Sequence, residues 1–192
     1  MVLTELHYLP LVSYFTRLRE DDFQIEAHEH YQKQSLRNRT YILTANGELV
    51  LTIPIQHGVI DIQDVKIDYS QDWVKNHLRA LESAYKHSPY YDYYFPYFED
   101  IYKQKLTFLF ELNLEFFRLI MKMLKWQKGI FLTKKFTLNY ESQIIDFRSN
   151  YQYRENQESN KPYQQVFGTE FIPNLSILDL LFNKGPDSYL FL

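Results

Sequence analysis

The stretch VLTELHYLPLVSYFTRLREDDFQIEAHEHY, residues 2–31, decides the fold. Residues 2–9 predict a strand, which ends at Pro10 because proline has no amide hydrogen to donate to a sheet. Residues 11–20 predict a helix, since apolar side chains recur at helical spacing at Leu11, Phe15 and Leu18. Residues 23–31 alternate apolar and polar side chains, as a strand with one buried face does. A strand, a helix and a second strand in this order favour an α/β or α+β fold.

The rest of the first seventy residues is also rich in strand signals. Asn46-Gly47 separates two β-rich runs within residues 41–55 and predicts a hairpin with a type I′ turn, which needs positive φ at both central residues. Residues 59–70 predict one or two further strands. We therefore expect residues 1–70 to be mainly strands with one early helix.

Residues 71–128 predict a helical layer. A first helix follows Ser70 and Asp72, either of which is a suitable N-cap. A tyrosine-rich segment then predicts a helix, or two helices broken at Pro96, because proline removes a hydrogen bond from a helix interior. Residues 105–127 predict a long helix that stops before a glycine.

Residues 129–192 predict a loop followed by a C-terminal helix. Residues 148–163 are polar enough for a loop, and Ser176 and Asp179 have the spacing of a capping box at the start of the helix. The expected architecture is one domain over residues 1–192, with a mixed β-sheet from the N-terminal half packed with helices from the C-terminal half.

Composition excludes several classes of protein. A net charge of −3 argues against general nucleic-acid binding, which needs a basic surface. The chain has no cysteine and no visible secretory signal, so we expect a cytoplasmic protein. Membrane insertion is not expected, because charged residues form a stripe on one face of the most apolar segment, at Glu111, Glu115, Arg118 and Lys122. Oligomeric state is not indicated by the sequence.

Known catalytic and cofactor motifs are absent from the sequence. It contains no G-x-S-x-G elbow, no glycine-rich phosphate loop, no H-E-x-x-H and no dinucleotide fingerprint. Kinase, P-loop and Rossmann dinucleotide-binding functions are therefore set aside, and no cofactor is expected.

Residues 26–39, EAHEHYQKQSLRNR, concentrate the most chemistry. Glu26, His28 and His30 would share one face of a strand, an arrangement that could hold a zinc or iron ion or form only a solvated surface. A third protein ligand could come from Glu5 or His7 if the two strands were neighbours.

Three cations in the same segment suggest a different ligand. Lys33, Arg37 and Arg39, next to Asn38, could bind phosphate or carboxylate oxygens, or could pair with the acids nearby. We favour an anionic small-molecule substrate over a metal ion at this segment.

Aromatic residues make up 18% of the chain, which predicts a cleft with aromatic walls. Tyr90 and Tyr91 are candidates for such walls, although tyrosines in this pattern are also typical of a core and its rim. His77 lies in a helical stripe with Trp73 and Leu81, which is typical of a buried core histidine.

Four segments in the same order resemble the WbqC-like protein family. HYLPLVSYF at residues 7–15 resembles its opening motif, with Ser13 in place of the family's glycine and without the leading Gln-Pro. HYQKQSLRNR resembles the family's Q-Y-x-K followed by Asn-Arg, and places Tyr31, Lys33, Asn38 and Arg39 on that pattern. Two further segments are similar to later family motifs: YKHSPYYDYYFP (85–96) and PYQQVFGTEFIPNLSILDLLFNKGP (162–186).

The family takes its name from a gene of surface-polysaccharide clusters, so the resemblance implies a transferase that acts on a nucleotide-linked sugar or amino sugar in bacterial surface-polysaccharide biosynthesis. The candidate acid or base would then be His7, His28 or His30. The candidate substrate-binding residues would be Tyr8, Tyr31, Lys33, Arg37, Asn38, Arg39, Tyr90 and Tyr91. A metal-dependent enzyme that uses Glu26, His28 and His30, and a non-catalytic partner protein that docks through residues 90–98, remain alternatives.

Overall fold

A four-stranded parallel sheet forms one layer of the protein. The computed structural model describes residues 1–56, 58–140, 143–149 and 161–192. Within them, the strands of this sheet lie in the order β5-β2-β1-β6, and every neighbouring pair is parallel. The strands are β1 (Val2–Thr4), β2 (Phe23–Ile25), β5 (Phe131–Leu132) and β6 (Ile145–Asp146). The predicted α/β class is confirmed.

Helix α1 (Val12–Leu18) connects β1 to β2, as the opening stretch predicted. Both strands are shorter than predicted. β1 ends at Thr4 instead of residue 9, and β2 ends at Ile25 instead of residue 31. After β1 the chain bonds elsewhere: the Tyr8 amide donates to the Leu36 carbonyl at 3.0 Å, and Leu9 has a φ of +42°. The residues released from the strands form the loops at the carboxyl end of the sheet.

Two of the four strands come from the segment in which we predicted only a loop and a helix. β5 and β6 are two residues long each, too short to show an alternating pattern. They lie at opposite edges of the sheet, so residues 129–149 reach both of its sides. Most of the polar loop predicted at residues 148–163 lies outside the described residues.

The predicted hairpin is present and forms a separate two-stranded sheet of β3 (Arg39–Thr44) and β4 (Gly47–Thr52). The predicted type I′ turn is wrong. Thr44 pairs with Gly47, and in this described hairpin Gly47 alone has positive φ, at +101°. A single positive φ at the glycine is the pattern of a type I turn followed by a glycine bulge.

The strands predicted at residues 59–70 are not formed. This segment instead contains a short 3₁₀ helix, η1 (Ile62–Asp64), and single bridges from Ile67 to Ile55 and from Lys66 to Phe108. Its buried side chains, including Val65, pack into the core. The alternating pattern therefore reflects one buried face of an irregular segment.

Three helices form a second layer, as predicted: α2 (Trp73–Tyr85), α3 (Tyr91–Lys103) and α4 (Leu109–Met123). α3 runs through Pro96 without a break, which corrects one of our alternatives. α4 begins and ends within the predicted residues 105–127. None of the helices in the described residues is long and apolar enough to cross a membrane.

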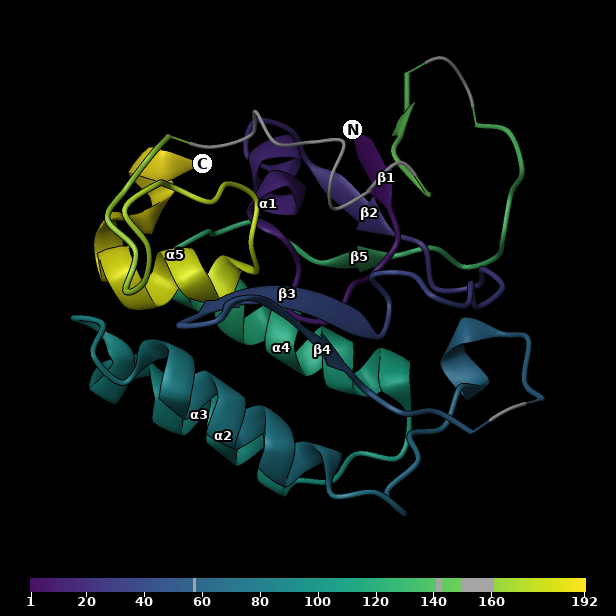
Figure 1. Cartoon of the computed structure of the whole chain (residues 1–192). Coiled ribbons are helices and arrows are strands. Elements are labelled where there is room, and N and C mark those ends of the chain that lie inside the picture. Colours follow the sequence, from purple (N-terminus) through teal and green to yellow (C-terminus); the bar gives the residue numbers. More distant parts are fainter. Residues whose placement is uncertain (57, 141–142, 150–160) are drawn as a thin grey trace.

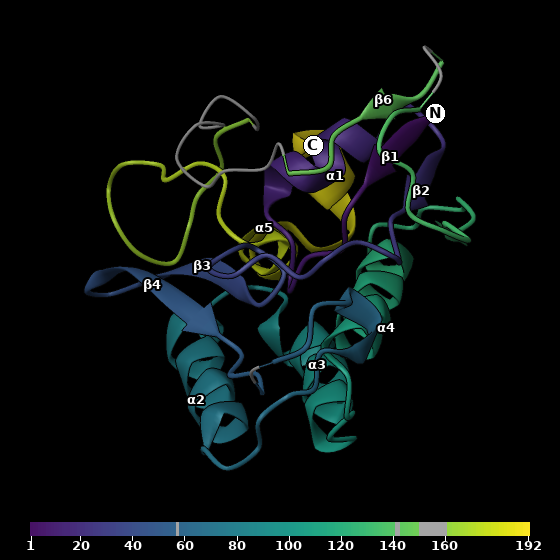
Figure 2. The same cartoon turned by 90° about the vertical axis from the view of Figure 1, so that its right-hand side faces the viewer.

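The C-terminal helix α5 (Ile177–Lys184) has Ser176 as its N-cap, and the Ser176 hydroxyl accepts a hydrogen bond from the Leu178 amide at 3.4 Å. The predicted capping box is half right, because the Asp179 carboxylate accepts from Tyr163 and Gln165 instead. A 3₁₀ helix, η2 (Gly185–Phe191), follows. Figures 1 and 2 show the β3–β4 hairpin between the parallel sheet and the helical layer.

Replacing Gly185 by alanine is expected to destabilise the protein by about 2–3 kcal/mol. Gly185 has φ +54° and ψ −126°, which strains any residue with a Cβ, and an added Cβ would lie 2.4 Å from the Tyr90 ring. Urea denaturation measures the loss. In the Tyr90→Ala background the same substitution should cost less, because the ring is gone, and an equal cost in both backgrounds would show that the ring contact is irrelevant.

Candidate functional site

The strand order creates a crevice at the carboxyl end of the sheet. The chain passes from β1 to β2 and β5 on one side, and then returns to β6 on the other side of β1. The order therefore reverses between β1 and β6. In open parallel sheets such a reversal separates the loops that follow the two strands, and ligands bind in the crevice between them.

Glu5 and His7 follow β1 and face this crevice. The His7 Nε2–H group donates to Glu5 Oε1 at 3.2 Å, and both side chains are almost completely buried. The two Glu5 oxygens also accept from the Ser149 amide, at 3.0 and 3.1 Å, which links the loop after β1 to the loop after β6. A carboxylate on Nε2 makes Nδ1 the basic nitrogen of the neutral imidazole ring.

The ionisation of this pair follows from its surroundings. Burial lowers the pKa of His7, and the hydrogen bond that His7 donates to Glu5 opposes that effect without reversing it. Burial acts to raise the pKa of Glu5, but His7 and the charge of Arg37 outweigh it, so that this pKa lies below its ordinary value. At pH 7 the pair is thus a carboxylate beside a neutral imidazole, the form in which a histidine accepts a proton.

A buried ion pair supports the floor of the crevice. Arg37 is 1% exposed and binds Glu29 with two hydrogen bonds, from Nε at 2.7 Å and from Nη2 at 2.5 Å. Its Nη2 also lies 3.9 Å from Glu5 Oε1. The Arg37 carbonyl accepts from the Asn113 side chain of α4 at 2.7 Å. The guanidinium that we predicted to bind substrate is therefore committed to two protein carboxylates.

A second buried ion pair joins β2 to the loop after β6. Glu26 is fully buried, and its carboxylate accepts from Arg148 Nη1 at 2.9 Å and from the Thr133 hydroxyl at 2.6 Å. Arg148 also binds Asp146 at 2.6 Å. The Glu26–Arg148 pair joins residues 122 positions apart in the sequence, whereas Glu29 and Arg37 are 8 positions apart.

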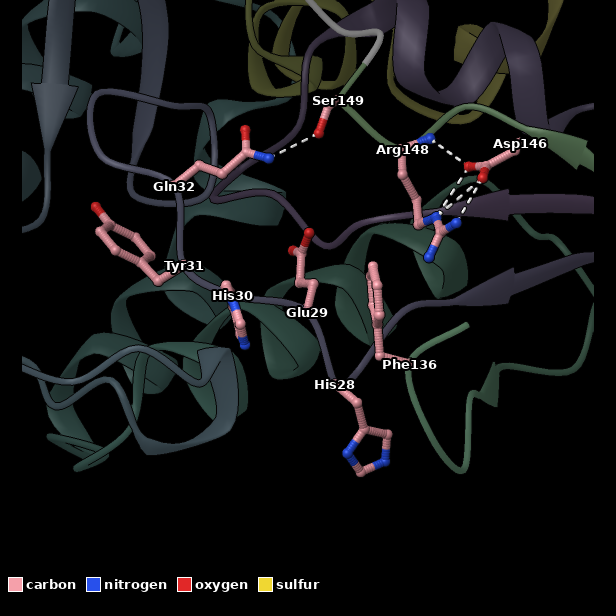
Figure 3. Close-up of a pocket in the computed structure, with 9 residues that line it drawn as sticks. All are labelled: His28, Glu29, His30, Tyr31, Gln32, Phe136, Asp146, Arg148 and Ser149. Carbon is pink, nitrogen blue, oxygen red and sulfur yellow. Dashed lines mark hydrogen bonds and ion pairs between the residues drawn. The ribbon is translucent and has the colours of Figure 1, made fainter. Parts of the chain in front are cut away.

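Three adjoining cavities open at this end of the molecule. The Glu29 cavity of 360 Å³ is shown in Figure 3 and is lined by His28, Glu29, His30, Tyr31, Gln32, Phe136, Asp146, Arg148 and Ser149. The His7 cavity of 340 Å³ includes Glu5, His7, Lys33, Arg37 and Arg39 in its lining. The Asn38 cavity of 660 Å³ includes Tyr31, Lys33, Asn38, Arg39 and Asp68.

The three cavities share walls. Gln32 and Ser149, which hydrogen-bond to each other at 2.9 Å, separate the Glu29 cavity from the His7 cavity. Lys33, Gln34 and Arg39 line both the His7 cavity and the Asn38 cavity. Residues 31–34 therefore border all three spaces, and each of the three volumes lies in the range of ligand sites.

The histidine and glutamate face considered as an alternative metal site does not form. Of Glu26, His28 and His30, the carboxylate is buried and engaged with Arg148, while His30 is exposed. In Figure 3 the rings of His28 and His30 point away from Glu29 and Arg148. The part of the chain that the structure describes contains no group of three or more potential ligands placed to hold a metal ion. The cause is that β2 ends at Ile25, so that the period of two no longer applies.

Other candidate residues lie away from the crevice. Tyr8 is fully buried in the core, where its hydroxyl contacts Tyr102 and lies 2.8 Å from His77 Nδ1. Tyr90 and Tyr91 pack at the start of α3 against α5: the Tyr90 amide donates to the Phe182 carbonyl and the Tyr91 ring lies 5.6 Å from that of Phe182. The prediction that His77 is a core histidine is confirmed by its exposure of 5%.

Several lining residues were missed by the sequence analysis. Gln32 and Glu29 lie inside the segment that we examined, but nothing in the local pattern distinguishes them from its other polar residues. Phe136, Asp146, Arg148 and Ser149 lie in the weakly patterned region after residue 129, where β6 is too short to predict. The local signal there was the apolar pair Ile144-Ile145, with the charged residues Asp146 and Arg148 after it.

Comparison with known proteins agrees with the resemblance seen in the sequence. The family model described as "WbqC-like protein family" matches residues 6–155 and 145–190. The uncharacterized protein Rv1507c of Mycobacterium tuberculosis (strain ATCC 25618 / H37Rv) is 35% identical over 89 residues, which are 44% of this chain. The match spans 38% of the length of that relative. No solved structure matches the chain. Since the family model covers most of the sequence, this chain belongs to the WbqC-like protein family.

Proposed function

We propose that the protein is a transferase that acts on a nucleotide-linked sugar or amino sugar, with a role in bacterial surface-polysaccharide biosynthesis. One observation carries the proposal. A carboxylate-bound neutral histidine, His7, and two cations, Lys33 and Arg39, line the same cavity at the strand-order reversal. Membership of the WbqC-like family supports the link to surface polysaccharides. We expect the reaction to take place in the cytoplasm, a reducing compartment that suits a chain without cysteine.

The phosphates of the substrate would bind at the wall between two cavities. Lys33 is exposed and Arg39 is half-buried, and each lines both the His7 cavity and the Asn38 cavity. Charge-assisted hydrogen bonds from ammonium and guanidinium groups to phosphate oxygens are among the strongest that proteins make. Arg37 would act indirectly, because it holds Glu5 and Glu29 in place and is not free to bind the substrate.

His7 would serve as the general base. It would take the proton from the hydroxyl or amine of the acceptor as that group forms its new bond to the transferred group. The bond to the nucleotide-linked phosphate would break at the same time, and the phosphate would leave with the electron pair. Glu5 would stabilise the protonated imidazole, and Lys33 and Arg39 would stabilise the charge on the leaving phosphate.

Lys33→Ala and Arg39→Ala are each expected to weaken the binding of a nucleotide-linked sugar about tenfold or more. The reason is that each removes a charge-assisted hydrogen bond worth about 1.5–3 kcal/mol. Calorimetric titration with a panel of nucleoside diphosphates and nucleotide-linked sugars measures the effect.

Lys86→Ala is the matched control. Lys86 is an exposed lysine at the C-cap of α2 that pairs with Glu82 at 3.0 Å and lines none of the three cavities. Its substitution should leave both affinity and stability unchanged. Wild-type affinity in both test variants, with the thermal unfolding midpoint preserved, would refute the proposed phosphate site.

A further inference from the structure

Two residues that line the Asn38 cavity each have a buried side-chain atom without a hydrogen-bond partner in the described part of the chain. This cavity is the largest of the three and lies beside the end of the β3–β4 hairpin, with Thr52, Ile53 and Gln71 in its lining. It is joined to the His7 cavity through Lys33 and Arg39. A ligand whose phosphate is bound at this wall could extend into the space.

Asn38 has a fixed orientation in the wall of this cavity. The side chain is 6% exposed, and its Nδ2 donates to the Ile53 carbonyl at 2.8 Å. The Ile53 amide in turn donates to the Asn38 carbonyl at 2.8 Å. With Nδ2 used in this way, Oδ1 is the atom left to accept a hydrogen bond, and it has no hydrogen-bond partner within the described residues. A buried amide oxygen in this state costs about 1–3 kcal/mol relative to one that is hydrogen-bonded.

Arg39 supplies the complementary group. Its Nε is buried and, among the residues that the structure describes, has no hydrogen-bond acceptor. Two neighbouring residues in the wall of the cavity therefore each have an unused polar atom, an acceptor on Asn38 and a donor on Arg39.

The pair discriminates between classes of ligand. A carboxylate or phosphate would accept from Arg39 Nε but would present oxygen lone pairs to Asn38 Oδ1. An ammonium group would donate to Asn38 but would be repelled by Lys33 and Arg39. A hydroxyl group both donates and accepts, so that adjacent hydroxyls satisfy both atoms at once. Tyr31 gives the cavity an aromatic ring, which packs against the apolar face of a sugar ring.

We propose that the Asn38 cavity is the subsite for a neutral, hydroxyl-bearing sugar ring of the substrate. This inference rests on the proposed function, because it places the sugar next to a phosphate held by Lys33 and Arg39. Asn38 Oδ1 accepts from one ring hydroxyl, and Arg39 Nε donates to a neighbouring oxygen.

The test compares two ligands that differ only in the sugar. Affinities for a nucleoside diphosphate and for the matching nucleotide-linked sugar are measured by calorimetry with the wild-type protein and with Asn38→Ala. We expect Asn38→Ala to weaken binding of the nucleotide-linked sugar about tenfold, the equivalent of one hydrogen bond, and to leave the nucleoside diphosphate unaffected. Equal changes for both ligands, or no change for either, would overturn the inference.

A second variant guards against misfolding of Asn38→Ala, which also removes a bond to Ile53. Gln71 is exposed and lines the Asn38 cavity, so Gln71→Trp should block the space without disturbing the core. It should weaken only the nucleotide-linked sugar. Gln127→Trp, at an exposed glutamine that lines none of the three cavities, is the matched control and should change neither affinity.

Free methyl glycosides separate the two proposals. Their binding to the wild-type protein and to Gln71→Trp is followed by saturation-transfer NMR. Glycoside signals that disappear in Gln71→Trp would support the subsite even if no nucleotide binds, and the proposed transferase function would then fail alone. A different result would refute the subsite and leave the phosphate site intact. In that case nucleoside diphosphates bind, methyl glycosides do not, and the nucleotide-linked sugar binds no more tightly than the nucleoside diphosphate. Absence of all binding would overturn both.

Discussion

Arg37→Met is expected to destabilise the protein by about 3–5 kcal/mol, because it leaves buried carboxylates without their cation. Arg37 is the only guanidinium that contacts Glu29 in the described structure, and it also lies 3.9 Å from Glu5. Burial raises the pKa of Glu29 even with Arg37 present. Without Arg37 this carboxylate must be protonated or hydrated, and either change costs free energy of folding.

Urea denaturation at pH 7 measures the loss, and Arg118→Met is the control. Arg118 pairs with Glu115 on the exposed face of α4 and should contribute less than about 1 kcal/mol. The result also decides the role of Arg37. A variant of wild-type stability that fails to bind nucleotides would show that Arg37 is a substrate-binding residue, as its sequence context first suggested, and would contradict the structural role assigned here.

The second large effect concerns pH and His77. Burial between Trp73, Tyr8 and Tyr102 lowers the pKa of His77 from 6.5 to about 4, although a hydrogen bond with the Thr52 backbone opposes the shift. The unfolded chain takes up this proton near pH 6.5, whereas the folded protein resists it until about pH 4. The stability contribution is therefore fully present above pH 6.5 and is lost as the pH falls through this window, by about 3 kcal/mol in total.

His77→Gln is expected to flatten this dependence. Its free energy of unfolding, measured in urea at intervals from pH 7 to pH 4, should fall less steeply than that of the wild type. His87→Gln, at an exposed histidine of the same region, should retain the wild-type slope. Parallel profiles for wild type and His77→Gln would show that His77 in the folded protein is protonated near its ordinary pKa of 6.5, which would contradict the expected shift.

The profile of His77→Gln must be compared with that of the wild type because Asp179 changes the stability with pH in the opposite direction. Burial raises the pKa of Asp179 from 3.8 to about 6, while hydrogen bonds from Tyr163 and Gln165 oppose the rise. A raised carboxyl pKa favours the folded state at low pH, and this contribution is lost as the pH rises from about 4 to 6. The wild-type profile therefore combines these two opposed contributions with those of other buried groups such as His7 and Glu29, and only the net effect is visible in it.

Local patterns in the sequence were sufficient for the elements that have a strong period or a specific turn residue. The order β1, α1, β2 follows from two apolar strands around a helical repeat, and α2 follows from the stripe that contains Trp73, His77 and Leu81. The hairpin position follows from Asn46-Gly47, although its turn type does not, because one glycine serves two turn geometries. These features depend on residues within about ten positions of each other.

The segment 26–39 shows how far local pattern extends towards the site. The sequence identified it as the densest chemistry, and it does line all three cavities. It could not assign roles within the segment. Arg37 and Arg39 have the same charge and are two residues apart, yet one is buried against Glu29 and the other lines two cavities. Only the placement of other chain segments distinguishes them.

Tertiary structure alone decided how the site is assembled. The Ser149 amide reaches Glu5 across 144 positions of sequence, and Arg148 reaches Glu26 across 122. Both contacts require β6 to lie beside β1. β6 has only two residues, which are too few to form a recognisable strand pattern in the sequence. The sequence by itself determined β1, α1, β2, the hairpin and the main helices, and the residue types of segment 26–39, because those depend on local propensity and periodicity. Strand order, and with it the meeting of His7, Lys33 and Arg39 at one cavity, depends on long-range burial and hydrogen bonding, to which no local pattern corresponds.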